Sequence, residues 1–133
     1  SDFVVKLIDA YPADYPDPDP EDELPMGGFQ QLVRGEPFRA KFRESFTEPQ
    51  PMTPGEPTRL RWTMPDVAHV FRAGHRIVVQ VQSSWFPLVD RNPQTFTDIP
   101  HAKPEEFRPA TQRVYHAAGR SSALELPVLG GSM

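Results

Sequence analysis

Alternating apolar and polar residues mark short strands along this chain. The clearest example is FRAKFR, residues 38–43, in which Phe38, Ala40 and Phe42 alternate with three basic residues. A period of two puts successive side chains on opposite faces of a strand, so one face is predicted to be buried and the other solvated. A basic row can also form a nucleic-acid-binding stripe, but a solvated face or an ion-paired domain interface is the commoner arrangement.

Other segments have the same strand character. Residues 58–64 (TRLRWTM) alternate again, with Leu60, Trp62 and Met64 predicted to face inward. The segment HRIVVQVQS, residues 75–83, is predicted to be the central strand. The remaining strands are expected at 3–8, followed by a turn at 9–12, at 29–33, and in a closing hairpin formed by 111–116 and 123–128.

Proline, glycine and acidic residues separate these runs. Residues 12–25 are dense in proline, aspartate and glutamate, so they are predicted to form a surface loop. A calcium loop is the alternative, but the EF-hand spacing with its central glycine is absent. Residues 66–74 are expected to form one helical turn or an irregular crossover, with Gly74 supplying a left-handed residue. Residues 85–109 have little strand character and are predicted to be irregular.

Composition narrows the fold class to all-β. The 133 residues suffice for one domain, and 38% of them are hydrophobic, which is enough for one core. Seventeen are proline, which excludes long helices because each proline fixes φ and removes a backbone donor. Six or seven short strands with long crossovers are typical of an antiparallel jelly-roll β-sandwich of the galactose-binding-domain-like kind. We therefore expect residues 1–133 to form a single β-sandwich domain.

Charge and cysteine content exclude several functions. The net charge is −4 and the 14 lysine and arginine residues are scattered, so no nucleic-acid partner is expected. The longest apolar run, residues 77–79, is far shorter than the roughly 20 residues that span a bilayer, so no membrane partner is expected either. The absence of cysteine excludes disulfides and thiolate-bound metals. No cofactor is expected, and no cellular compartment is indicated.

The patterns of known catalytic sites are missing from the sequence. There is no Gly-x-Ser-x-Gly elbow of the α/β-hydrolase type, and Ser83 and Ser84 are better explained as the end of a strand. The four histidines lack the spacing of a metal site, although His69 and His75 flank one predicted turn and could meet across it. The chain is therefore expected to be non-catalytic by itself and to hold no metal.

The segment most suggestive of function is WFPLVDRN, in which two aromatic residues precede three polar ones: Trp85, Phe86, Asp90, Arg91 and Asn92. The rings could stack on a sugar while the polar groups hydrogen-bond its hydroxyls. The alternative is that the aromatic residues pack on a neighbouring domain while the charged pair fixes the loop. An apolar loop on a free domain normally indicates a partner surface, so these five residues are the predicted domain-docking site.

Several segments, taken in order, resemble one family of hydrolases. They are DFVVKLIDAYP, MGGFQQLVRGEPFRAKFRESF, PDVAHVFRAGHRIVVQVQSSWFPLVDRNPQ, ATQRVYH and ALELPVL. Together they resemble the C-terminal domain of the X-Pro dipeptidyl-peptidases and cocaine-esterase-like (CocE/NonD) hydrolases. Within that group they are most similar to the α-amino acid ester hydrolases and cephalosporin (glutaryl) acylases. The likeness runs nearly end to end and is most specific at residues 73–92.

The resemblance implies a three-part protein with an α/β-hydrolase domain, a helical cap and this C-terminal jelly roll. Such enzymes cleave ester or amide bonds by acyl transfer through the serine of an upstream Ser-His-Asp triad, so no residue here is assigned a catalytic role. The family's jelly roll has strands that precede the position of Ser1, so the chain is expected to be truncated at its N-terminus.

Two expectations about partners follow from this resemblance. The hydrolase and cap domains are the expected partners, and an unpaired strand edge could also drive self-association. The chain is thus expected to be a non-catalytic accessory domain. The alternative function is a stand-alone carbohydrate-binding module.

Overall fold

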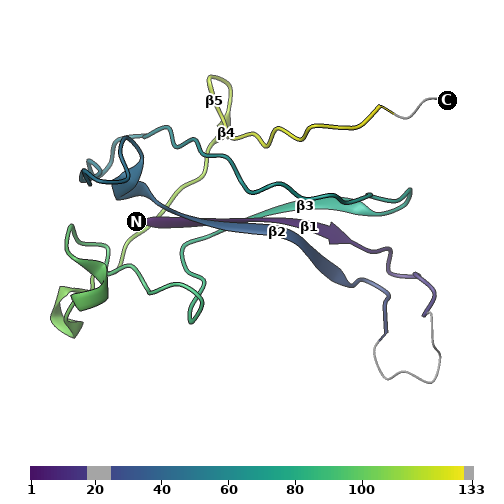
Figure 1. Ribbon diagram of the computed structural model, residues 1–133, viewed down its shortest axis with the longest axis horizontal. Coiled ribbons are helices and arrows are strands. Elements are labelled where there is room, and N and C mark those ends of the chain that lie inside the picture. Colours follow the sequence, from purple (N-terminus) through teal and green to yellow (C-terminus); the bar gives the residue numbers. More distant parts are fainter. Residues whose placement is uncertain (18–24, 131–133) are drawn as a thin grey trace.

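The computed structural model describes residues 1–17 and 25–130. A three-stranded antiparallel sheet has the order β2-β1-β3, in which β1 is Asp2–Ala10, β2 is Gln30–Arg39 and β3 is Arg76–Gln82 (Figure 1). The described residues contain no α-helix. Their only helical turns are three short 3₁₀ segments, and none of them is long and apolar enough to cross a membrane. The predicted all-β antiparallel class is confirmed.

The centre of the sheet is β1, because this strand has apolar residues on both faces. Val4, Leu7, Ile8 and Ala10 are all buried. The prediction that residues 75–83 form the central strand is wrong, since β3 stands at an edge of the described sheet. Its apolar row is 41% to 53% exposed and consists of Ile77, Val79 and Val81.

One strand, β2, joins two runs that the sequence pattern separates. Strands are predicted at 29–33 and 38–43, whereas a continuous strand covers most of both. Its register against β1 shifts between Leu7 and Ile8, which marks a β-bulge. The extra residue on the β2 side is Val33, and its insertion allows both runs to pair with the same neighbour.

The strand predicted at 38–43 ends earlier than expected. After Arg39 the chain enters a 3₁₀ turn, η1 (Ala40–Phe42). Phe38 and the first residue of η1 are buried as predicted, but Phe42 is only half-buried because the turn interrupts the alternation. The basic residues that alternate with them are also half-buried: Arg39, Lys41 and Arg43.

A second layer faces the sheet, and it consists of extended chain rather than paired strands. Residues 58–64 have no ladder partner in the described chain, so the predicted strand there is not formed. The predicted facing is correct, because Leu60, Trp62 and Met64 are half-buried while the residues between them are exposed. Trp62 stacks on Phe38 with 4.7 Å between ring centroids and 4° between ring planes. This contact holds the segment against the sheet.

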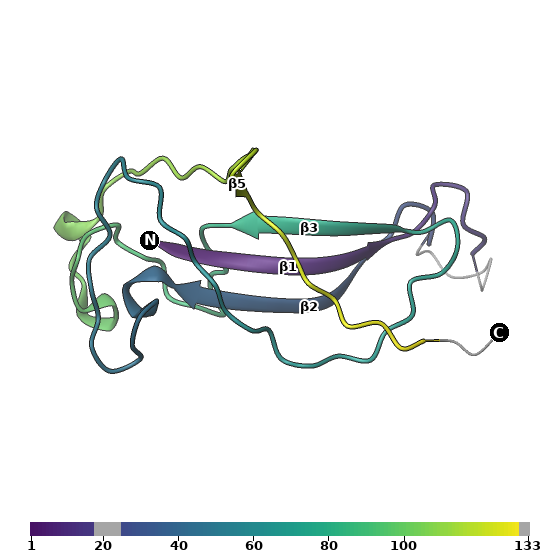
Figure 2. The same ribbon diagram turned by 90° about the horizontal axis from the view of Figure 1, so that it is seen from above.

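The C-terminal segment also lies over the sheet, and Figure 2 shows it crossing the three strands. Its hairpin is confined to β4 (His116–Ala117) and β5 (Arg120–Ser121), with Gly119 in the left-handed region at φ 75°. The strands predicted at 111–116 and 123–128 are therefore mostly extended chain without a ladder in the described part of the molecule.

The connections between these elements are irregular. Residues 66–74 form no helical turn and end in a left-handed glycine at φ 87°. Residues 85–109 contain the 3₁₀ turns η2 (Ile99–His101) and η3 (Pro104–Glu106). The acidic loop predicted at 12–25, with its calcium-binding alternative, lies partly outside the described residues.

A hollow of about 3050 Å³ separates the two layers. The sheet contributes the exposed apolar row of β3 to one wall, and residues 51–72 and 119–129 line the other. Residues 58–71 take part in no backbone–backbone hydrogen bond within the described chain. Extended chain that lacks backbone–backbone partners therefore borders the hollow.

Candidate functional site

The predicted docking loop begins where β3 ends. Ser83 and Ser84 follow the last strand residue, as the sequence predicts. The indole of Trp85 packs against Gly35 of β2, where a Cβ would lie 2.5 Å from the indole Cη2 atom. The Nζ atom of Lys6 lies 4.6 Å from the centroid of the same ring. Only glycine at position 35 leaves room for the indole in this place, so the indole anchors the loop on the sheet.

This packing bears on the carbohydrate-binding alternative. A sugar platform needs a flat, exposed ring beside free polar groups. The Trp85 ring is instead half-buried, with Gly35 against its edge and Lys6 near its centre. The geometry of the loop gives that alternative no support.

The following residues present apolar side chains to solvent. Phe86 is 64% exposed and Leu88 is 68% exposed. The central guanidinium carbon of Arg91 lies 5.5 Å from the Phe86 ring centroid and 5.7 Å from the Phe107 ring centroid, within the range of cation–π contacts. Aromatic residues and arginine are enriched where proteins contact one another, so the loop has the composition of a contact surface.

Asp90 and Asn92 connect the loop to the sheet. An Oδ2 atom of Asp90 lies 4.0 Å from Nη2 of Arg39. Asn92 donates from Nδ2 to Oδ1 of Asp2 at 2.7 Å. Burial raises the pKa of Asp2, against the lowering effects of this hydrogen bond and of the Arg39 charge.

The five predicted docking residues therefore separate into two groups. Trp85 and Asn92 face the sheet and hold the loop there, with Asp90 at its edge. Phe86 and Arg91 remain at the surface. The loop is thus fixed on one side and open on the other.

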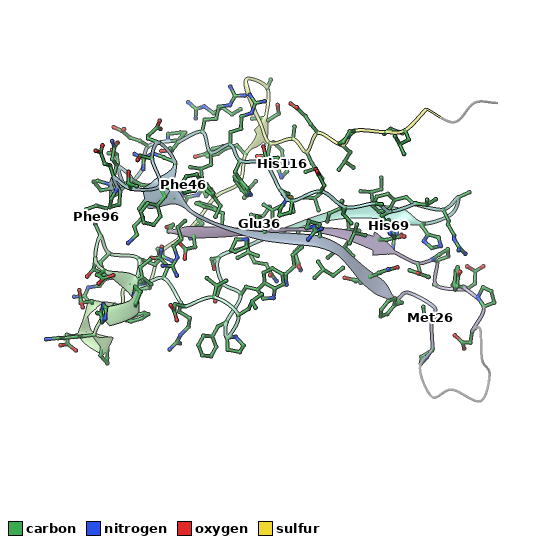
Figure 3. The ribbon with its side chains drawn as sticks, viewed as in Figure 1. Met26, Glu36, Phe46, His69, Phe96 and His116 are labelled. Carbon is green, nitrogen blue, oxygen red and sulfur yellow. The ribbon has the colours of Figure 1, made fainter. Side chains whose placement is uncertain are left out.

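The apolar surface continues beside the loop. A shallow hollow of about 260 Å³ is lined mainly by apolar residues: Pro37, Phe38, Arg39, Phe42, Phe46 and Val89. Phe46 is 85% exposed and Phe96 is 57% exposed. Figure 3 places both at the end of the molecule where β2 finishes.

At the opposite end of the sheet, Asp9 joins two histidines. Its side chain is 2% exposed, and its two oxygens accept hydrogen bonds from Nε2 of His69 and Nδ1 of His75, each at 2.9 Å. Figure 3 shows His69 beside the sheet, far from Phe46. Burial raises the pKa of Asp9, but the hydrogen bonds and the charges of the two histidines together outweigh burial and place this pKa below its ordinary value.

The sequence predicted this cluster only in part. His69 and His75 were expected to meet across a turn, and they meet on a carboxylate that the pattern assigned to the turn at 9–12. Asp9 instead belongs to β1. The available signal was its position two residues after Leu7, in register with one face of the strand.

Within the described residues, no group of three histidine, aspartate or glutamate side chains is arranged to hold a metal ion. In the cluster at Asp9, each histidine directs one ring nitrogen at the carboxylate. The loop at residues 85–92 offers different chemistry, namely an exposed apolar surface that includes the positive charge of Arg91.

Comparisons with known proteins agree with this picture. Residues 1–125 match the family model described as the X-Pro dipeptidyl-peptidase C-terminal non-catalytic domain. The cocaine esterase of Rhodococcus sp. (strain MB1 Bresler) is 31% identical over 129 residues, which are 97% of this chain and 20% of that protein.

Two solved structures resemble the chain. An aminopeptidase from the marine sediment archaeon Thaumarchaeota archaeon is 47% identical, with a TM-score of 0.72 over 80% of this chain and 17% of the aminopeptidase. An α-amino acid ester hydrolase is 45% identical, with a TM-score of 0.72 over 81% of this chain and 17% of the hydrolase. The chain spans about a fifth of the length of these relatives or less.

Proposed function

The chain belongs to the family of X-Pro dipeptidyl-peptidase C-terminal non-catalytic domains, and on this premise we propose that it serves a larger serine hydrolase acting on ester or amide bonds. One observation carries the proposal. The family match covers residues 1–125, yet the relatives named as esterase, aminopeptidase and ester hydrolase are about five times longer than this chain. The catalytic part of the larger protein lies in the remaining length.

The first prediction separates the activity of the whole protein from that of this chain. The full-length protein should hydrolyse p-nitrophenyl esters or dipeptidyl amides, and the isolated chain should not, because the chain lacks an activated nucleophile and an oxyanion site. Replacement of the serine in an upstream Gly-x-Ser-x-Gly elbow by alanine should abolish turnover. Turnover by the pure isolated chain, or an upstream reading frame without such a serine, would contradict the proposal.

The domain packs on the hydrolase and cap domains through the loop from Trp85 to Asn92. Two features of the loop support this proposal. Trp85 and Asn92 hold the loop to the sheet, while Phe86 and Leu88 are mostly exposed. A loop fixed in this way loses little conformational freedom when a partner covers it.

Strands from the rest of the larger protein fill the hollow between the sheet and the extended segments. Support comes from the apolar row of β3, which is 41% to 53% exposed, and from residues 58–71, which lack backbone partners in the described chain. Paired strands would satisfy both the backbone groups and the apolar face. Without them, the isolated chain should associate with copies of itself through its open edge.

A further inference from the structure

The guanidinium group of Arg91 is oriented by aromatic rings and forms no ion pair with any described residue of its own domain. Its central carbon lies 5.5 Å from the ring centroid of Phe86 and 5.7 Å from that of Phe107. None of the ion pairs among the described residues involves Arg91. The nearest acidic residue in sequence, Asp90, lies instead beside Arg39 at 4.0 Å. The Arg91 charge therefore remains available to a partner.

The surroundings of this charge have the composition of an interface anchor. Phe86, Leu88 and Phe107 are 64%, 68% and 37% exposed, and with Arg91 they form what we term the Arg91 cluster. Arginine and aromatic residues dominate the binding energy of protein contacts when they are covered together. A covered guanidinium without a counter-charge would be strongly destabilising, so a partner of this cluster needs an acidic group.

We propose that the Arg91 cluster binds an apolar surface of the catalytic part of the larger protein, and that a carboxylate on that surface pairs with the Arg91 guanidinium. The planar guanidinium presents parallel donors that match the two oxygens of a carboxylate. The inference rests on the proposed function, because it assigns the partner to the same polypeptide. It adds the chemistry of the contact, which is an aspartate or glutamate side chain among apolar groups.

A second copy of this chain fits the cluster poorly. A symmetric contact between two copies would bring the same patch of each together. Where the cluster lies on the two-fold axis, the two Arg91 charges face one another, and like charges across an interface are unfavourable. The rest of the larger protein carries no such restriction, since its surface need not repeat the cluster.

The test uses the full-length protein with Arg91→Lys and a carbodiimide, which couples a lysine amine to a neighbouring carboxylate with loss of water. We expect a cross-link from position 91 to an aspartate or glutamate outside residues 1–133, located by peptide mass. The matched control is Arg76→Lys, which replaces an exposed arginine at the start of β3, away from the loop and outside the hollow, and should give no such product. Absence of a cross-link from position 91, or coupling only within residues 1–133, would overturn the carboxylate assignment.

Hydrogen exchange in the full-length protein separates this inference from the broader proposal. Arg91→Gln should accelerate exchange in the loop roughly tenfold, since a hydrogen bond to a charged group is worth about that factor. Phe86→Ser should accelerate exchange as well, because it removes apolar area that the partner covers. Acceleration by Phe86→Ser alone would retain the docking of the loop and refute the carboxylate. No acceleration by either variant would refute docking through this cluster, while the activity assays decide independently whether the domain is non-catalytic.

Discussion

Asp2 and Asp9, near the two ends of β1, have carboxyl groups whose pKa values shift in opposite directions. At Asp2, burial raises the pKa more than the Asn92 hydrogen bond and the Arg39 charge lower it. At Asp9, burial also raises the pKa, but the hydrogen bonds and charges of two histidines together more than offset that effect. An ionised carboxylate stabilises the fold where its pKa is lowered and destabilises it where its pKa is raised.

Loss of the Asp9 charge should destabilise the protein in acid. The folded-state pKa of Asp9 lies below an unfolded value of about 3.9, so its contribution is present above about pH 4 and is lost as the pH falls through the folded pKa. Asp9→Asn removes the charge and one acceptor. It should lower the free energy of unfolding at pH 7 by about 1–3 kcal/mol, as measured by urea denaturation. The difference from the parent should shrink as the pH is lowered.

The matched control for that measurement is Asp2→Asn, for which the opposite sign is expected. Because the folded pKa of Asp2 is raised, its charge costs stability as the pH rises from about 3.9 through the folded pKa. Removing the charge should leave stability at pH 7 unchanged or greater. Equal losses in the two variants would show that the histidine contacts at Asp9 add no specific stabilisation.

Gly35→Ala tests whether Trp85 anchors the predicted docking loop on the sheet. The new Cβ would lie 2.5 Å from Cη2 and 2.7 Å from Cζ3 of the indole, so the ring must move. We expect a loss of about 1–3 kcal/mol, as for other overpacked sites, and a red shift of Trp85 emission in a Trp62→Phe background. Gly130→Ala is the control, because nothing lies within 4 Å of its added Cβ. Unchanged emission would mean that the indole does not depend on this contact.

At the residue level, the sequence predicted contacts that depend on local spacing. His69 and His75 are close together because a short turn separates them. The roles of Asp9 and Gly35 depend on residues in other elements, and a local pattern contains no information about which distant side chain lies opposite. The sequence alone identifies the exposed aromatic loop at residues 85–92 from its residue types. It does not show that Trp85 turns inward onto Gly35, because that contact joins two distant elements.

Segments with alternating apolar and polar residues form strands here only where a neighbouring strand lies in the described chain. Residues 2–10, 30–39 and 76–82 find partners in each other and form strands. Residues 58–64 show the same alternation and the same inward apolar side, yet they form no ladder in the described chain. Alternation records which side of a segment is covered, whereas a strand also requires a neighbouring backbone to accept and donate hydrogen bonds.

Phe38 and Phe42 provide a test of where β2 ends. Phe38→Ala should cost about 3–5 kcal/mol, because this ring is 8% exposed and stacks on Trp62. Phe42→Ala should cost clearly less, since Phe42 is half-buried in η1. Chemical denaturation of both variants measures the difference. Equal large losses would place both rings in the core, as uninterrupted alternation predicts.

On the scale of the whole molecule, apolar surface is exposed on both sides of a thin sheet. The hollow lies over the face that contains Ile77, Val79 and Val81, while Trp85 packs on the opposite face, against Gly35. A domain with two such surfaces is suited to a position between other parts of a larger protein rather than to a free existence.

Self-association of the isolated chain tests whether the β3 edge of the described sheet is free to pair with another copy. Sedimentation velocity should show an average mass that rises with concentration, because the β3 edge is unprotected in the described sheet. Val79→Lys should weaken the association, since charges on an edge strand oppose pairing. Arg113→Lys, which keeps the charge at an exposed site, should leave it unchanged. A parent chain that stays monomeric at every concentration would contradict the open edge.

The order of the strands has a consequence for synthesis of the protein on the ribosome. The first strand to emerge, β1, is the one that needs two neighbours, and Val4 pairs with Gln82 across most of the chain. At about 5–20 residues per second, β1 and β2 must wait several seconds for β3. Contacts between such distant residues also form slowly, because the loop must close before they contribute. A nascent chain with one side of β1 bare for that interval is a natural substrate for chaperones.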